Sequence, residues 1–428
     1  IKGPAAMIFG QAASLGGLIN YVSRRPTRTH QAEVKAAVGS FDYYRGEAHV
    51  SGPLTSTLRY RADVGLTDSD WSDRRFGFYK DNFIGGGIEY DIGPKTMLTV
   101  DGYVTQVDYY YPTTMMDPVT NQLLAQSRDF TIDDDFAFHN TYQRRVTATL
   151  VSQLSDSVQL RLFGAYNSSG NDWLRPYALS LAADNATLSR ITESFITDPY
   201  FSNFQSDLLW SFDTGPLAHK FSLGGDARFT VDGYTNESFA LAPINIRNPV
   251  YGAVPSTVPG SGAGGYVDYY KADITTSSVY VQDQIDLFSS RVSLIAGARY
   301  NNFKQISRNP RAATVVNNLQ RDDKIVHRFG ALYHPVRNTT IYVNNSQSFT
   351  FNFGRDTITG APFVPSVGEV KEVGVKGEFF DGALSLSAAY FDMKLTNVRV
   401  QFTQGPNDPT PGGQGIRQTG TERNEGFE

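Results

Sequence analysis

Residues 58–67 read LRYRADVGLT, and this stretch decides the fold. Its apolar side chains, such as Val64, alternate with polar ones, such as Asp63. Successive side chains of a β-strand point to opposite faces, so a period of two predicts a strand with one apolar and one charged face. The same alternation recurs at residues 145–150, 158–163 and 372–379.

The predicted strands come in pairs with a regular asymmetry. Short turns rich in Gly, Pro, Asp and Asn, such as those at residues 93–95 and 214–216, join two long strands. Longer polar and aromatic connections follow each pair, at residues 68–81, 109–139, 169–200, 234–268, 301–321 and 350–368. Short turns at one end and long loops at the other are typical of an outer-membrane β-barrel. A water-soluble sandwich could also alternate, but strand length and loop asymmetry favour the barrel.

The strand count can be read from the same pattern. We expect roughly fifteen strands between Glu33 and Val398 and a sixteenth that starts near Gly420, each about 9 to 15 residues long and so able to cross a bilayer at the usual tilt. The fold class predicted from the residues is therefore all-β, a transmembrane antiparallel barrel.

Composition excludes several other classes of protein. The chain has 428 residues, no cysteine and a formal net charge of −5. No disulfide framework or thiolate chemistry is possible, and the acidic balance predicts no nucleic-acid partner. Aromatic residues make up 13 %, which fits the aromatic girdles that such barrels place against outer-membrane lipid.

Five separated stretches together resemble one family, the TonB-dependent siderophore receptors. The opening string IKGPAAMIFGQAASLGGLINYVSRRP is similar to the end of the family's plug domain. Residues 50–61 resemble the first barrel hairpin, SSVYVQDQIDL followed by LIAGARYNNF the mid-barrel pair, and residues 369–398 a later hairpin. Residues 418–428 resemble the start of the next strand.

This resemblance implies an architecture. The family has a barrel of 22 strands filled by a plug, so the sequence is expected to hold a portion of that barrel, with about 15–16 strands present. Residues 1–30 are expected to be the C-terminal part of the plug and residues 31–428 a partial barrel. Both ends look like cuts, and an incomplete barrel should form an open curved sheet or a strained closure.

The resemblance also implies a function. A receptor of this kind imports a ferric siderophore across the outer membrane of a Gram-negative bacterium, energised by TonB, whose contact box is not in this sequence. It is not an enzyme and needs no cofactor, because the iron travels within the siderophore. Another cargo, such as cobalamin, haem or a glycan, would leave the fold unchanged. A barrel enzyme or a porin is a weaker alternative, since each lacks a plug.

A bulky iron chelate needs aromatic surfaces and donors for anionic oxygens, and arginine provides the better-matched donors. Candidate ligand contacts lie in the plug apex and near the loop ends of strands: Phe9, Gln11, Tyr109, Tyr110, Tyr111, Trp173, Tyr177, Tyr269, Tyr270, Phe349 and Phe351. Phe9 stands where the family often has Tyr. For each of these residues, interface or loop packing is the alternative reading.

A second set of residues could hold the plug against the barrel. By resemblance, Glu372 and Glu428 match glutamates that face the lumen, and alternation also puts Glu372 on the charged face. Their basic partners would be Lys2, Arg24 or Arg25, and the sequence does not choose among them. No metal site is predicted, because the six histidines are scattered and the acidic run 133–135 lacks the spacing of a calcium loop.

Overall fold

The computed structural model describes residues 22–70, 75–112, 130–262, 264–312, 314–406, 408–409 and 412–428. These residues form strands, turns and loops, and they contain no helix long and apolar enough to span a membrane. The strands are β1 (Gln31–Gly39), β2 (Tyr43–Pro53), β3 (Leu58–Ser69), β4 (Phe78–Gly93), β5 (Thr96–Tyr110), β6 (Phe138–Gln153), β7 (Val158–Leu181), β8 (Thr187–Thr197), β9 (Tyr200–Thr214), β10 (Leu217–Asn245), β11 (Val267–Leu287), β12 (Val292–Arg308), β13 (Asn318–Val336), β14 (Thr339–Thr350), β15 (Ser366–Phe379), β16 (Leu384–Thr403) and β17 (Gln414–Phe427).

Almost every strand pairs antiparallel with the next strand along the chain. The exception is at β8 and β9, which both lie between β7 and β10. Asp198 and Pro199 separate these two strands, and proline has no N–H to continue a ladder. The carbonyl of Pro199 still accepts the Ser169 N–H at 3.0 Å. The described residues hold seventeen strands, two of which share one position, so they fill sixteen positions in the sheet. This break accounts for the difference from the predicted fifteen to sixteen strands.

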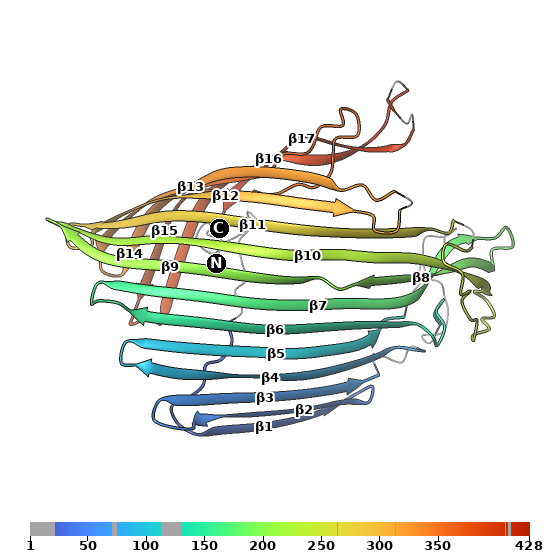
Figure 1. Ribbon diagram of the computed structural model, residues 1–428, viewed down its shortest axis with the longest axis horizontal. Helices are drawn as coiled ribbons and strands as arrows, with labels where there is room; N and C mark the ends of the chain where they lie inside the picture. The colour runs from blue at the N-terminus through green and yellow to red at the C-terminus, as the bar shows by residue number, and fades with distance from the viewer. Residues whose placement is uncertain are drawn as a thin grey trace.

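The result is a single curved sheet with different ends (Figure 1). Tight turns such as 215–216 gather at one end, and long connections such as 246–266 gather at the other. The ladders run from β1 to β17, and among the described ranges no residue of β1 is registered with β17. This is the all-β antiparallel barrel wall that the alternation predicted.

The distribution of apolar and charged side chains over the two faces of the sheet is the inverse of that in a soluble protein. On β3, Val64 on the outer face is 47 % exposed, whereas Arg59 on the inner face is 2 % exposed. On β11, Val279 points outward beside the buried, inward-pointing Tyr280. Apolar side chains on the outer face are the surface that lipid would cover, and charged side chains line the inside.

At the long-connection end, three strands extend beyond their neighbours (Figure 1). β7 continues to Leu181, β8 begins at Thr187, and β10 continues to Asn245. The predicted loop 169–200 is therefore largely strand, whereas the predicted loop 234–268 is strand at its two ends and a connection over 246–266. A small apolar core lies between these extensions and the nearby connections, made of Phe130, Ile132, Leu188, Ile244 and Ile246. Packing of loops on both faces removes the need for strict alternation, which explains the wrong prediction.

Candidate ligand-binding site

Six aromatic rings form a row across neighbouring strands near the long-connection end. We call them the aromatic row: Tyr109 of β5, His139 of β6, Trp173 of β7, Phe195 of β8, Tyr234 of β10 and Tyr270 of β11. The successive ring centroids lie 4.3, 6.5, 5.5, 5.6 and 5.5 Å apart. Rings at such spacings form a continuous aromatic surface.

The strand register produces this row. His139 lies directly opposite Tyr109 on one side and Trp173 on the other. Trp173 in turn lies opposite Phe195, and Tyr234 lies opposite Tyr270. Directly opposite residues in antiparallel strands have neighbouring Cβ atoms, so one aromatic residue on each strand is enough to build the row.

The row lies on the inner, polar face. Along β5, Tyr103 has the same parity as Tyr109, and its hydroxyl donates to Gln143 at 2.9 Å. The opposite parity carries Val104 and, on β6, Val146, both exposed on the outer face. A molecule inside the barrel wall would therefore meet the aromatic row.

Gln305 of β12 extends the row to a second aromatic group. Its side-chain amide donates to the Tyr270 hydroxyl at 3.1 Å, and its own carbonyl oxygen is buried without a hydrogen-bond partner among the described residues. Phe303 lies two residues earlier on the same face and stacks on Phe351 at 4.2 Å. Phe349 and Phe353 complete this phenylalanine cluster, which consists of Phe303, Phe349, Phe351 and Phe353.

Guanidinium groups lie over rings of this wall. Arg175 lies 4.3 Å from the ring centroid of Trp173 and forms an ion pair with Glu193 at 3.5 Å. The hydroxyl of Tyr266, in the connection before β11, donates to the same Glu193 at 2.5 Å. Burial, and then this hydrogen bond, raise the pKa of Tyr266, so it remains a protonated donor that orients Glu193. Rings with adjacent guanidiniums suit a planar, anionic ligand.

Of the predicted ligand residues, six lie at the site, three lie outside it, and two lie outside the described residues. Tyr109, Trp173 and Tyr270 belong to the aromatic row, Phe349 and Phe351 belong to the phenylalanine cluster, and Tyr111 packs on Tyr109 at 4.8 Å. Tyr110, Tyr177 and Tyr269 lie outside both groups. Phe9 and Gln11 lie outside the described residues.

The three separated tyrosines have clear positions. Tyr110 is buried and has the opposite parity to Tyr109 on β5. Tyr269 likewise has the opposite parity to Tyr270, donates its hydroxyl to Glu237 and carries the Arg311 guanidinium 4.1 Å from its ring centroid. Tyr177 is exposed farther along the β7 extension.

Sequence reasoning missed five aromatic side chains of the site: His139, Phe195, Tyr234, Phe303 and Phe353. Phe195 lies within the predicted loop 169–200, and His139 lies at the end of the predicted loop 109–139. Extending the parity of the β5 and β6 inner faces to their ends would have placed His139 beside Tyr109. Phe195 and Tyr234 needed the register across the β8 position, which alternation alone does not give.

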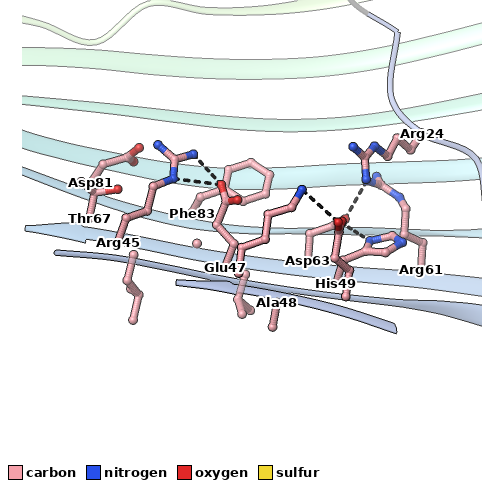
Figure 2. Close-up of a pocket in the computed structure, with 15 residues that line it drawn as sticks. Arg24, Arg45, Glu47, Ala48, His49, Arg61, Asp63, Thr67, Asp81 and Phe83 are labelled. Atoms are coloured by element: carbon pink, nitrogen blue, oxygen red, sulfur yellow. Dashed lines mark hydrogen bonds and ion pairs between the residues drawn. The ribbon is translucent and has the colours of Figure 1, made fainter. Parts of the chain in front are cut away.

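A second region of the inner wall, on β1–β4, is lined mainly by charged side chains, with the ring of Phe83 among them (Figure 2). Arg45 is paired with Glu47, and Asp63 accepts from His49 at 2.5 Å and from Arg61 at 2.6 Å. These side chains line a cavity of about 420 Å³. Such a wall suits a polar protein segment better than an apolar ligand.

The residues predicted to join plug and barrel are distributed over two parts of the sheet. Arg24 lines the charged cavity (Figure 2), and Arg25 lies 3.9 Å from Glu89 of β4. Glu372 of β15 accepts the Tyr342 hydroxyl. The backbone of Glu428 exchanges two hydrogen bonds with Ala389 of β16, at 2.9 and 3.0 Å. Lys2 lies outside the described residues.

Known proteins resemble the whole of this chain. The metal-pseudopaline receptor CntO of Pseudomonas aeruginosa is 29 % identical over 446 aligned residues, which cover 100 % of this chain and 60 % of that receptor. The ferripyoverdine receptor of the same species is 26 % identical, over 96 % of this chain and 50 % of the receptor. The chain thus spans half to three-fifths of the length of these two relatives.

Solved structures show the same fold. The siderophore receptor PiuA from Acinetobacter baumannii superposes with a TM-score of 0.82 at 20 % identity, over 100 % of this chain and 64 % of that one. The family described as TonB dependent receptor-like, beta-barrel, matches residues 70–428. That match covers β4 to β17, including every residue of the aromatic row and the phenylalanine cluster. The chain therefore belongs to the TonB-dependent receptor β-barrel family.

Proposed function

We propose that this chain forms the wall of an outer-membrane receptor that imports a ferric siderophore and draws its energy from TonB. The observation that carries the proposal is the aromatic row, a continuous surface of six rings on the inner face of a barrel of this family. In this proposal residues 1–30 belong to the plug and residues 31–428 to the barrel, and lipid covers the outer face.

The residues would act by binding and orientation, without covalent chemistry. Trp173 and Tyr234 offer ring faces to planar groups of the chelate, and Arg175 offers donors to its anionic oxygens. Gln305 donates to the Tyr270 hydroxyl at 3.1 Å and so helps to hold that ring in the row. No catalytic residue is assigned, and the iron enters and leaves within its chelator.

Uptake measurements test this proposal. A strain that lacks its own copy of the gene would carry the full-length protein, and cells would be given a panel of ⁵⁵Fe-loaded siderophores under iron limitation. We expect Trp173→Ala to weaken binding of the accepted siderophore about tenfold, which corresponds to about 1.4 kcal/mol. Trp210→Ala is the matched control, because Trp210 lies on the outer face of β9 near the short turns. Equal loss in both variants, or uptake of no ferric siderophore, would refute the proposal.

A second candidate is uptake of a chelate that carries a metal other than iron. One observation favours it, the 29 % identity with a receptor named for a metal-pseudopaline complex. The aromatic row would serve either cargo, because it recognises the chelator and not the ion. The same cells grown with iron, zinc, nickel and cobalt, and analysed for metal content, separate the two candidates.

A further inference from the structure

Residues 22–30 form an extended segment before β1 that follows the inner wall, and we call it the strap. The Ser23 hydroxyl donates to Asp101 of β5 at 2.9 Å. Arg25 lies near Glu89 of β4, and the Thr27 N–H donates to Ser51 of β2 at 2.9 Å. The strap therefore crosses the inner face of β2–β5, beside the charged cavity of Figure 2.

The second half of the strap is firmly held. Pro26 is buried, and Thr27 bonds Ser51 through both its N–H and its hydroxyl, at 2.9 and 3.0 Å. Ser51 is itself buried and donates to the Tyr60 carbonyl at 2.9 Å. A Cβ on Gly52 would come within 2.4 Å of His30, so only glycine allows the strap to lie this close to β2.

The first half of the strap is weakly held. Val22 is 78 % exposed, and Ser23 makes one solvent-exposed hydrogen bond. The Arg25 side chain is 67 % exposed and stands 3.9 Å from Glu89. Only the Arg25 side of this pair is solvated, because the Glu89 side chain is 8 % exposed, and the separation of 3.9 Å is too long for a hydrogen bond.

The wall beneath Arg25 does not depend on it for hydrogen bonds. Arg59, which is buried, donates to one Glu89 oxygen at 3.0 Å and to both oxygens of Asp91 at 2.7 Å. Two carboxylates against one guanidinium leave one negative charge, and Arg25 balances it from a distance. The cluster therefore keeps its hydrogen bonds when Arg25 moves away.

From this contrast we propose that the strap contains a hinge at Arg25–Pro26, with residues 22–25 leaving the wall while residues 26–30 stay on it. Proline fixes its own φ and restricts the residue before it to extended conformations, which gives the joint a defined direction. The role of this hinge in transport rests on the proposed function, which places residues 1–30 in the plug. The existence of the hinge does not rest on the proposed function.

Two pairs of introduced cysteines test the hinge in the full-length protein, which can form no other disulfide within the described chain. The first pair, Ser23→Cys with Asp101→Cys, ties the first half to β5. The second, Thr27→Cys with Ser51→Cys, ties the half that is already fixed and is the matched control. We expect the oxidised first pair to abolish uptake and reduction to restore it, while the second pair has no effect in either state.

A second measurement needs no cargo. Single variants Ser23→Cys and Thr27→Cys are labelled with a maleimide in bilayers at increasing urea, below barrel unfolding. We expect the labelling rate of Cys at 23 to rise at least tenfold at urea concentrations that leave the rate of Cys at 27 unchanged. Rates that rise together with urea, or full uptake with the first pair oxidised, would overturn the hinge. If the parent imports no ferric siderophore, the proposed function fails and the labelling rates alone decide the hinge.

Discussion

A single buried arginine organises the long-connection end of the molecule. Arg190 of β8 and Asp134 are both fully buried and lie 3.0 Å apart. Arg190 also donates to the carbonyls of Ile132 and Ala242, and the second Asp134 oxygen accepts the Gly252 N–H at 2.7 Å. A buried ion pair is tolerated when every donor and acceptor is satisfied, so this pair holds two connections on the β7–β8 hairpin.

Removing one partner should release those connections. Arg190→Met leaves the Asp134 carboxylate buried without its cation, which costs about 3–5 kcal/mol. We expect residues 130–137 and 246–262 to become sensitive to protease while the barrel stays folded. Limited proteolysis with mass spectrometry measures this. Arg247→Gln, at an exposed arginine of the same region, should leave the cleavage pattern unchanged, and identical patterns in both variants would contradict the assignment.

At the scale of strands, alternation in the sequence predicted the strands that face lipid, but it did not predict the strand extensions that lie beyond the lipid. LRYRADVGLT became β3 because lipid on one side and charged neighbours on the other impose alternation. The β7 extension, with Trp173 and Pro176, lacks that pattern, which predicts a loop, yet it is ladder-paired to β8 with one register shift after Ala178. Lipid does not impose alternation on this extension, where Pro176 is buried and Tyr177 and Leu179 are exposed, so a period of two could not reveal the strand.

The β7–β8 turn should be sensitive to acid. Hydrogen bonds from the Thr187 hydroxyl, and then from the N–H groups of Thr187 and Ala186, lower the pKa of Asp184 to about 2. A carboxyl whose pKa is lowered on folding stabilises the turn above its ordinary pKa of 3.8, and that contribution is lost as pH falls from about 4 to about 2.

Pepsin digestion at pH 4 and pH 2 measures this effect. We expect cleavage at residues 182–186 to rise at pH 2 relative to other sites, and Asp184→Asn to show high cleavage at both values. Asp156→Asn, in the exposed β6–β7 turn, serves as the control. A turn that resists pepsin equally at both values would show that the Asp184 hydrogen bonds do not hold it.

At the scale of the whole molecule, the wall was predictable and the site was not. Each strand's faces follow from its own ten residues, so inner and outer surfaces could be assigned locally. The aromatic row joins Tyr109 to Tyr270 through six strands, and its spacing depends on every register between them. Three of its six members were nevertheless selected, because aromatic residues near strand ends are informative by themselves.

The assignment of faces can be tested by adding charge. Leu223→Arg on β10 puts a guanidinium on the outer face, whereas Ser222→Arg, the adjacent residue, puts it on the inner face. We expect the first to lower the free energy of unfolding in a bilayer by about 2–4 kcal/mol near the midplane, and the second to have a much smaller effect. Urea titration in lipid vesicles measures both losses. A larger loss for Ser222→Arg than for Leu223→Arg would show that the inner and outer faces are assigned the wrong way round.

The pairing of nearly every strand with its successor also governs assembly. A sheet with this strand order can form one hairpin at a time. Each new strand pairs with the strand before it, so only the connection between those two strands must be ordered. Among the described strands, the β8 position is the one place where a strand must pair in two pieces, at Asp198–Pro199. Growth of the sheet should therefore slow there, midway along the chain, and an arrested folding intermediate would contain β1–β7.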